Sequence, residues 1–406
     1  MTFKPEITQV GNYTLLIEAK DALNVIYKYT DASGVQRDTL VKASNLNLMY
    51  AQQNVGQVII KINVFDAGRL LFKPIDENYH EHYGFDDALT VQCQQSSDYE
   101  KINMNGADYF VSWLGTVKNN DVEIKMEYIG NILDADTKIK LKCSSNNLTM
   151  DGRTRETDLY DLFQFQNIIF KASQEGTYYV QAFLASSDGT EICRIGKIKI
   201  DSKPMRPVKK VRIIRVKRSD ETLCPTVDKA QLIHEVNSLY KQAFLKFDLD
   251  NAAYNDSLPI AKATTDMVGL GYLTDSIGLT FANDIYYIFI VSKNNNETKA
   301  GEGLLTGGKM TQGTTVTELR LKKASVLFGH TDSDVATHEL GHNLGLQHIW
   351  ENDANVNAYS YTLNHRNRFL IPQYTTRNPM DYIRTGTPKT HRRYFYKYQI
   401  EHLITR

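Results

Sequence analysis

The sequence has little of what a disulfide scaffold, a membrane protein or a nucleic-acid-binding protein needs. Its 406 residues include only four cysteines, too few for a disulfide framework. It has no run of 18 or more apolar residues, so we expect no membrane-spanning helix. Its 47 basic and 47 acidic side chains give a formal net charge of zero, which argues against a nucleic-acid partner.

The first residues, MTFKPEITQV, also lack the apolar segment of a secretory signal peptide. Three explanations stay open: the protein remains inside the cell, a signal has been replaced by a methionine, or export uses a route that needs no signal peptide. We expect an extracellular or exported protein, and a cytoplasmic location stays open.

What the sequence does have, in its first half, is a series of short β-prone runs separated by turn residues. These runs cover residues 13–19, 24–30, 57–64, 108–113, 121–128, 137–143, 166–171, 177–184 and 193–200. Several alternate apolar and polar side chains, which is the period of a half-buried antiparallel strand. We therefore expect an all-β, sandwich-like N-terminal region, with a β-rich domain over residues 1–90 and an immunoglobulin-like β-sandwich over residues 91–202. These modules are candidates for binding a protein partner.

The second half of the sequence has a different pattern. The segment DSKPMRPV at 201–208 carries two prolines and predicts a linker. After it we expect the solvated edge of a strand at 209–218, a helix at 228–247, strands at 284–291 and 318–329, and a final helix at 391–405. Alternating helices and strands predict an α/β or α+β domain over residues 208–406, so the chain is expected to be multidomain.

The stretch HELGHNLGLQH at 338–348 concentrates three of the chain's 10 histidines. On a helix His338 and His342 lie four residues apart on one face, so both imidazoles can bind one Zn²⁺. Glu339 is turned about 100° around the helix from His338 and can reach a water molecule at that metal. Gly345 can end the helix with a left-handed residue, which lets His348 return to the same metal. Three protein ligands leave the fourth position open, as catalytic zinc sites do.

These residues resemble the metzincin metalloproteases, H-E-x-x-H-x-x-G-x-x-H. The segment Asn378-Pro-Met-Asp-Tyr is similar to the Met-turn of that family. Its sequence looks closest to that of pappalysin-like and related bacterial secreted proteases. The resemblance implies a metzincin fold over 208–406, one catalytic zinc and a protein or peptide substrate. It also implies that Met380 forms a hydrophobic floor below the metal and that Tyr382 stabilises the oxyanion.

On this interpretation the protein is a zinc endopeptidase in which Glu339 is the general base and acid for a metal-activated water. We expect the substrate to pair with a sheet edge formed by GEGLLTGGKMTQG at 301–313. The candidate edge residues are Leu304, Leu305, Gly307 and Gly308. Elsewhere we expect His330 and Cys224 to be ordinary surface and buried residues.

Two alternatives remain open. One is an effector or toxin protease that is injected into a foreign cell, which the missing signal and the β modules permit. The other is an inactive metzincin that serves as a binding or delivery module. The presence of Glu339 argues against an inactive domain, because inactive relatives often lose this residue.

Overall fold

The computed structural model describes the chain in segments. They are residues 11–19, 24–30, 36–42, 58–64, 68–76, 83–87, 99–104, 107–130, 137–161, 166–217, 226–250, 257–259, 282, 284–291, 300–303, 309–312, 315–318, 323–329, 332–349, 376–382 and 394–405. The chain divides into two compact units, Met1–Arg69 with Ile129–Thr137 and Leu70–Tyr128 with Lys138–Arg406. This division does not test the domain boundaries predicted at residue 90 and at 202–208, which remain predictions.

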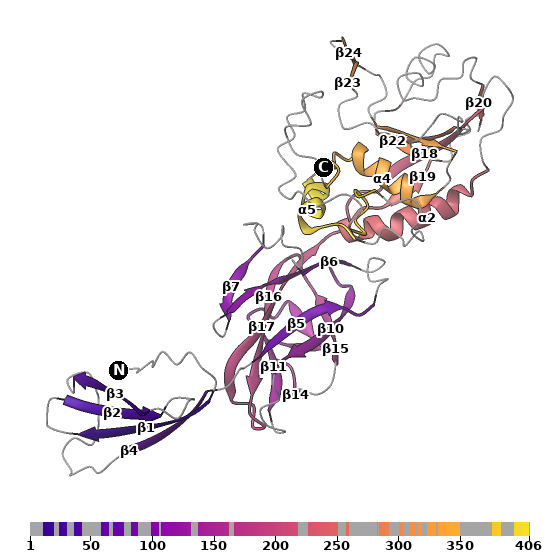
Figure 1. Ribbon diagram of the computed structural model, residues 1–406. Coiled ribbons are helices and arrows are strands. Elements are labelled where there is room, and N and C mark those ends of the chain that lie inside the picture. The colour runs from indigo at the N-terminus through magenta and orange to yellow at the C-terminus, as the bar shows by residue number, and fades with distance from the viewer. Residues whose placement is uncertain are drawn as a thin grey trace. The chain divides into compact units, whose positions relative to one another are not determined.

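The first unit contains a four-stranded antiparallel sheet in the order β3-β2-β1-β4 (Figure 1). Its strands are β1 (Gly11–Ala19), β2 (Asn24–Thr30), β3 (Gln36–Lys42) and β4 (Val58–Val64). Strands β1, β2 and β4 lie where the alternating sequence predicts strands, and β3 was not predicted.

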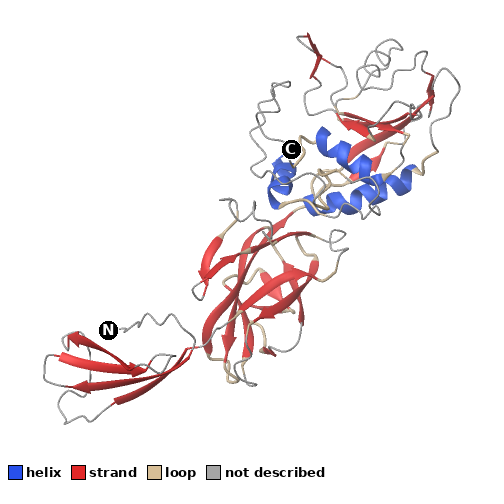
Figure 2. Cartoon of the chain, viewed as in Figure 1, coloured by secondary structure: helices blue, strands red, loops and turns tan. Residues whose placement is uncertain are grey.

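The second unit begins with two β-sheets (Figure 2). Alternate side chains of their longer strands are buried. One sheet has the order β13-β12-β15-β10-β5, and its strands are Arg153–Thr154, Leu148–Met150, Gln166–Ala172, Asp121–Ile129 and Arg69–Pro74. The other has the order β14-β11-β16-β17-β9-β6, with strands Tyr160–Asp161, Lys138–Cys143, Gly176–Ala185, Glu191–Lys203, Ser112–Val117 and Gly84–Asp86. A hairpin of β7 (Lys101–Met104) and β8 (Ala107–Phe110) accompanies them.

One tyrosine ties the two sheets together. The Tyr109 hydroxyl donates to the Leu70 carbonyl on β5 at 2.9 Å and accepts from the Lys197 amide on β17 at 3.1 Å. Glycine is needed at Gly196 on β17, because a Cβ there would lie 2.8 Å from the Leu70 carbonyl oxygen. We call the region formed by these two sheets the sandwich.

The rest of the second unit is built on a mixed sheet in the order β19-β18-β21-β25-β22, with β20 also pairing with β18. The strands are β18 (Lys209–Lys217), β19 (Phe247–Leu249), β20 (Ser257–Pro259), β21 (Ile285–Val291), β22 (Gly301–Gly303) and β25 (Ala324–Phe328). All pairs are parallel except β22 with β25, which is antiparallel. Every residue of β21 and β25 is buried, as expected for inner parallel strands. A separate hairpin joins β23 (Lys309–Gln312) and β24 (Thr315–Glu318).

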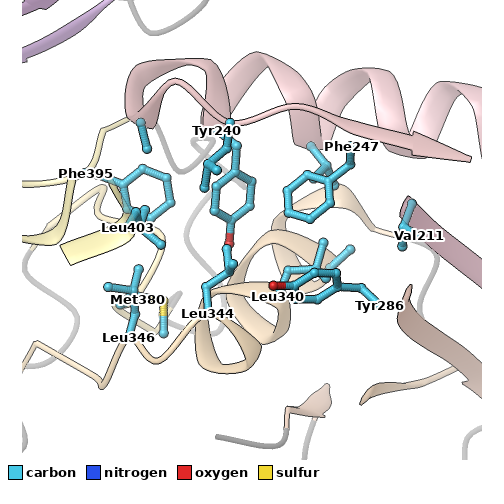
Figure 3. Packing of buried hydrophobic residues seen from close by; sticks show 14 of the residues in the cluster. Val211, Tyr240, Phe247, Tyr286, Leu340, Leu344, Leu346, Met380, Phe395 and Leu403 are labelled. Carbon is cyan, nitrogen blue, oxygen red and sulfur yellow. The ribbon is translucent and has the colours of Figure 1, made fainter. Parts of the chain in front are cut away.

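Among the described residues, three helices accompany the mixed sheet: α2 (Lys229–Tyr240), α4 (Ser333–Asn343) and α5 (Lys397–Thr405). Helices α2 and α4 contact each other, and α4 contacts β22 and β25. Tyr240 points from α2 toward α4 (Figure 3), and its hydroxyl donates to the Thr337 carbonyl at 2.8 Å. The buried cluster around Tyr240 includes Met380 and Phe395, and it also includes Tyr99 and Trp113 of the sandwich.

Several predicted elements differ from the structure. The helix expected to reach residue 247 ends at Tyr240, and a short 3-10 turn, η3 (Lys241–Ala243), leads to Phe244 with a left-handed φ of 58°. The final helix begins at Lys397 rather than at 391. The strand expected as an edge at 209–218 is β18, which has neighbours on both sides.

In the described part of the chain, strands predominate and helices are few. No helix there is long and apolar enough to cross a membrane.

Candidate metal centre

Helix α4 places two of the three histidines and begins at a well-formed cap. The Asp332 side chain accepts from the Asp334 amide at 2.9 Å, which satisfies one of the amides that a helix start leaves without an intrahelical partner. At the last residue of the helix, Asn343 bonds β25: its Nδ2 donates to the Ala324 carbonyl at 2.9 Å, and its Oδ1 accepts from the Ser325 hydroxyl at 3.1 Å. The helix carrying the histidines is therefore fastened to the inner part of the sheet.

The end of α4 explains how the third histidine returns. Gly345 has a φ of 92°, a conformation that costs glycine little. Its amide donates to the His342 carbonyl at 2.8 Å, and the Leu346 amide donates to the Gly341 carbonyl at 2.9 Å. This pair of bonds is a Schellman motif, which reverses the chain direction. The turn predicted at Gly345 is present, and His348 follows it.

The three imidazoles converge on one point. His348 Nε2 lies 3.1 Å from His338 Nε2 and 3.2 Å from His342 Nε2. Two nitrogens bound tetrahedrally to one ion at ~2.0–2.1 Å are about 3.3 Å apart, so these separations suit a shared metal. In the described part of the chain, these three residues form the group of His, Cys, Asp or Glu side chains that could hold a metal ion.

Backbone carbonyls set the tautomers of two of the rings. His338 Nδ1 lies 2.7 Å from the Pro379 carbonyl oxygen, and His342 Nδ1 lies 2.8 Å from the Leu346 carbonyl oxygen. A carbonyl oxygen only accepts, so each Nδ1 carries a proton, and in the neutral imidazole each Nε2 then presents a lone pair. Such outer partners orient metal-binding histidines and raise their basicity.

Glu339 lies beside this centre and is packed tightly against β22. Its side chain is 5% exposed. A Cβ at Gly301 would lie 2.6 Å from Glu339 Oε1, and a Cβ at Gly303 would lie 2.5 Å from the Glu339 carbonyl oxygen and 3.0 Å from its Oε2. The two glycines of β22 therefore give the carboxylate its room.

The segment around Met380 lies on the other side of α4. Met380 is fully buried, and a Cβ at Gly341 would overlap its sulfur. The turn is closed locally, because the Met380 amide donates to Asn378 Oδ1 and the Asp381 amide donates to the Asn378 carbonyl, both at 2.9 Å. Figure 3 shows Met380 close to Leu346, beside α4.

Tyr382 stands at the open side of the centre. Its side chain is 40% exposed, and its ring centroid lies 4.9 Å from that of His348 and 5.7 Å from that of His338. The structure thus brings Tyr382, Met380 and Gly345 together with Glu339 and the three histidines.

Other candidates fall outside the described residues, namely Leu304, Leu305, Gly307, Gly308, His330 and Cys224. Sequence reasoning missed the polar residues that fasten the centre, Asn343, Asn378 and Gln399. A signal was available for two of them: Asn343 lies in the histidine motif, and Asn378 opens the Met-turn segment.

No protein-family model and no curated protein matches this sequence. Among solved structures, the D00-D0 domain of Intimin is similar to part of it, with 9% sequence identity and a TM-score of 0.17. The match covers 44% of this chain and 63% of that one, so this chain spans less than two thirds of that structure. A TM-score of this size supports no common fold.

Proposed function

We propose that the protein is a zinc-dependent endopeptidase with a metzincin-like catalytic domain. The observation that carries the proposal is the convergence of three Nε2 atoms, two of them with tautomers set by backbone carbonyls. Neutral imidazole nitrogens in a set of three are the ligands that catalytic zinc prefers. The resemblance of HELGHNLGLQH and of Asn378-Pro-Met-Asp-Tyr to metzincins supports the same conclusion.

The residues present fit one divalent ion. His338, His342 and His348 would hold it, and a Zn²⁺ there would lower the pKa of a water molecule toward ~7 and polarise the substrate carbonyl. Glu339 is positioned to take a proton from the attacking water on its carboxylate and to deliver it to the leaving amine nitrogen. Its burial against Gly301 and Gly303 restricts the carboxylate to few orientations.

Tyr382 is the candidate for stabilising the developing negative charge. Its exposure and its position beside the rings of His338 and His348 let its hydroxyl reach a substrate held at the centre. Strand β22 is the candidate substrate edge, because it is the terminal strand of the mixed sheet and passes alongside Glu339. An extended peptide would add to that edge through backbone hydrogen bonds.

The test is metal analysis combined with cleavage of a peptide library by the full chain. We expect one zinc per chain and proteolysis that a chelator abolishes and zinc restores. Glu339→Gln should retain the metal and lose at least about 100-fold in kcat/KM, because general base catalysis contributes about 10²–10⁴-fold. The half-buried residue Glu235 on α2 supplies a control outside the centre, and Glu235→Gln should cleave like the wild type.

The outcomes separate the alternatives. Metal binding without any cleavage would favour an inactive binding or delivery module. Cleavage confined to proteins of another organism's cells would favour an injected effector. A folded chain that binds no divalent metal, or a Glu339→Gln variant with full activity, would overturn the proposal.

A further inference from the structure

A carboxylate of the sandwich caps the final helix of the mixed-sheet region. Asp86 on β6 is 7% exposed. Its Oδ2 accepts from the Tyr99 hydroxyl at 2.5 Å and from the amide of Lys397, the first residue of α5, at 2.9 Å. A carboxylate at a helix N-terminus satisfies an amide that has no partner within the helix, and it also interacts favourably with the helix dipole.

The same helix start is fastened to the Met-turn by one glutamine. Gln399 Oε1 accepts from the Tyr396 amide at 2.9 Å, as in a capping box. That oxygen also accepts from Asn378 Nδ2 at 2.6 Å, and Gln399 Nε2 donates back to Asn378 Oδ1 at 3.2 Å. Asn378 and Gln399 are each 1% exposed, so water does not replace these bonds.

Asn378 in turn determines where a metal ligand is held. Its Oδ1 accepts from the Met380 amide at 2.9 Å, which orients the peptide unit between Pro379 and Met380. The Pro379 carbonyl of that unit accepts from His338 Nδ1 at 2.7 Å. Hydrogen bonds joined by the backbone of Tyr396 and Lys397 therefore lead from Asp86 through the start of α5 and the Met-turn to His338.

The packing at the start of this series leaves little room for movement. A Cβ at Gly84 on β6 would lie 2.9 Å from Ile400 Cδ1 on α5 and 3.0 Å from the Gln242 carbonyl oxygen. Gln242 is fully buried, and its Oε1 accepts from the Phe395 amide at 3.2 Å. Strand β6 is thus in direct contact with α5, which Gln399 bonds to the Met-turn.

We propose that Asp86 is a positioning residue for the metal centre, so that the sandwich sets the orientation of His338 and is part of the catalytic apparatus. This inference rests on the proposed function only in naming a metal as the ligand. Its general consequence is that the β modules do more than bind partners: one of their strands supports the Met-turn.

A merely structural role for Asp86 is the competing explanation, and the chain offers a matched control. Asp201 on β17 is 8% exposed. Its carboxylate accepts from Trp113 Nε1 at 2.6 Å and from the Thr177 hydroxyl at 2.5 Å. Both carboxylates are buried and bonded to an aromatic side chain of the same hydrophobic cluster. Only Asp86 bonds α5, so loss of either should reduce stability, whereas loss of Asp86 should also affect the metal centre.

The experiment compares Asp86→Ala, Asp86→Asn and Asp201→Ala in the full chain. Zn²⁺ and Co²⁺ affinities are measured by competition with a chromogenic chelator, and the Co²⁺ absorption spectrum is recorded. Residues that bond metal-binding histidines directly contribute about 10–100-fold to metal affinity. Asp86 acts through several bonds, so its effect should be smaller. We expect Asp86→Ala to weaken metal binding about 3- to 10-fold and to shift the Co²⁺ absorption spectrum. Asp86→Asn keeps an acceptor oxygen and should restore most of the affinity.

A second readout needs no metal. Hydrogen exchange of the Met380 amide in the metal-free chain should accelerate in Asp86→Ala and stay unchanged in Asp201→Ala, because that amide bonds Asn378. If Asp86→Ala fails to fold, the same two measurements on Tyr99→Phe take its place, because this variant loses the hydroxyl that bonds Asp86, and unchanged values there would overturn the proposal. Equal metal affinity and equal exchange in Asp86→Ala and Asp201→Ala would also overturn it. A wild type that binds no metal would instead reject the proposed function, while the exchange data would still decide whether Asp86 holds the turn.

Discussion

The sandwich and the metal centre are held together in different ways. In the sandwich, adjacent strands share long ladders, such as the antiparallel pair β10 and β15, and alternate side chains fill the core. At the metal centre, single hydrogen bonds join segments far apart in the sequence: His338 to Pro379, Asn378 to Gln399, and Asp86 to Lys397. Stability is therefore distributed in the sandwich, whereas the proposed function would depend on a few bonds at the centre.

The largest effect should follow from removing a ligand at the centre. His342→Ala deletes one of three Nε2 atoms, and we expect zinc affinity to fall at least about 100-fold, because even outer partners of zinc ligands contribute about 10–100-fold. Chelator competition measures the change. The exposed His234 on α2 is the control, and His234→Ala should bind zinc like the wild type. Equal affinities in His342→Ala and His234→Ala would show that the three rings are not the ligands.

The difference between the two regions also explains what the sequence could predict. Alternation is a local property, and the runs 121–128 and 166–171 became β10 and β15 within a residue of their predicted ends. The histidine motif and Gly345 could also be predicted from local sequence, because their geometry follows from residue spacing on a helix and from one turn. Asp86 and Gln399 carry no such local signal, since their partners are set by the fold.

Helix ends were predicted poorly for the same reason. The start of α5 depends on Gln399, which bonds the Tyr396 amide, and on Asp86 from a distant strand. After α2, the 3-10 turn η3 ends at Phe244, a bulky residue that has a left-handed conformation and a side chain buried in the core. Tertiary contacts override local preference in both places.

The second prediction concerns the sandwich core. Leu141 on β11 is fully buried, and Leu141→Ala should lower the free energy of unfolding by about 2–5 kcal/mol, because it removes buried methyl groups and leaves a cavity. Unfolding in denaturant measures this loss of stability. The zinc affinity of Leu141→Ala, measured under conditions where the chain is folded, should equal that of the wild type. Lys140→Ala, on the opposite face of the same strand, should change stability by about 0.5 kcal/mol or less. A zinc affinity that falls with Leu141→Ala would show that the core of the sandwich, and not Asp86 alone, supports the metal centre.

The third prediction compares two glycines, one from each region. Gly303→Ala would place a methyl group 2.5 Å from the Glu339 carbonyl oxygen, so α4 or β22 must shift, and we expect kcat/KM to fall about 10-fold. Gly152→Ala meets no atom within 4 Å but has a φ of 78°, so it should cost about 1 kcal/mol of stability and leave kcat/KM unchanged. Peptide-cleavage kinetics and thermal unfolding of both variants test this contrast. Full activity in Gly303→Ala would show that Glu339 does not need the contact with β22.

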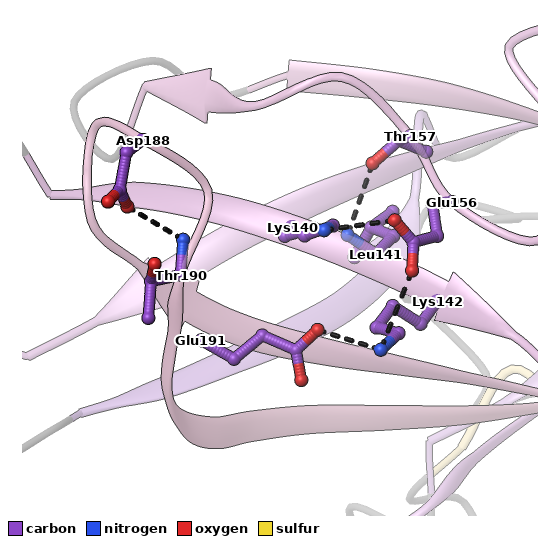
Figure 4. Close-up of polar contacts among 8 residues, drawn as sticks. All are labelled: Lys140, Leu141, Lys142, Glu156, Thr157, Asp188, Thr190 and Glu191. Carbon is purple, nitrogen blue, oxygen red and sulfur yellow. Dashed lines mark hydrogen bonds and ion pairs between the residues drawn. The ribbon is translucent and has the colours of Figure 1, made fainter.

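The smallest effect is expected at the exposed surface of the sandwich, where Asp188 lies near the ion pairs of Lys140 and Lys142 (Figure 4). Two hydrogen bonds to the Asp188 carboxylate lower its pKa to about 2. The larger contribution comes from the Ser186 hydroxyl and the next from the Thr190 amide. Since the folded pKa lies below the ordinary value near 3.8, the stabilisation is present above that pH and is lost as the pH falls toward 2. A carbon-detected NMR titration should show the low pKa, Ser186→Ala should raise it toward its ordinary value, and Ser187→Ala should leave it unchanged. An unchanged Asp188 pKa in Ser186→Ala would assign the lowered pKa to the backbone of the turn instead. Zinc affinity should not change in Ser186→Ala or in Ser187→Ala, because these bonds do not reach the metal centre.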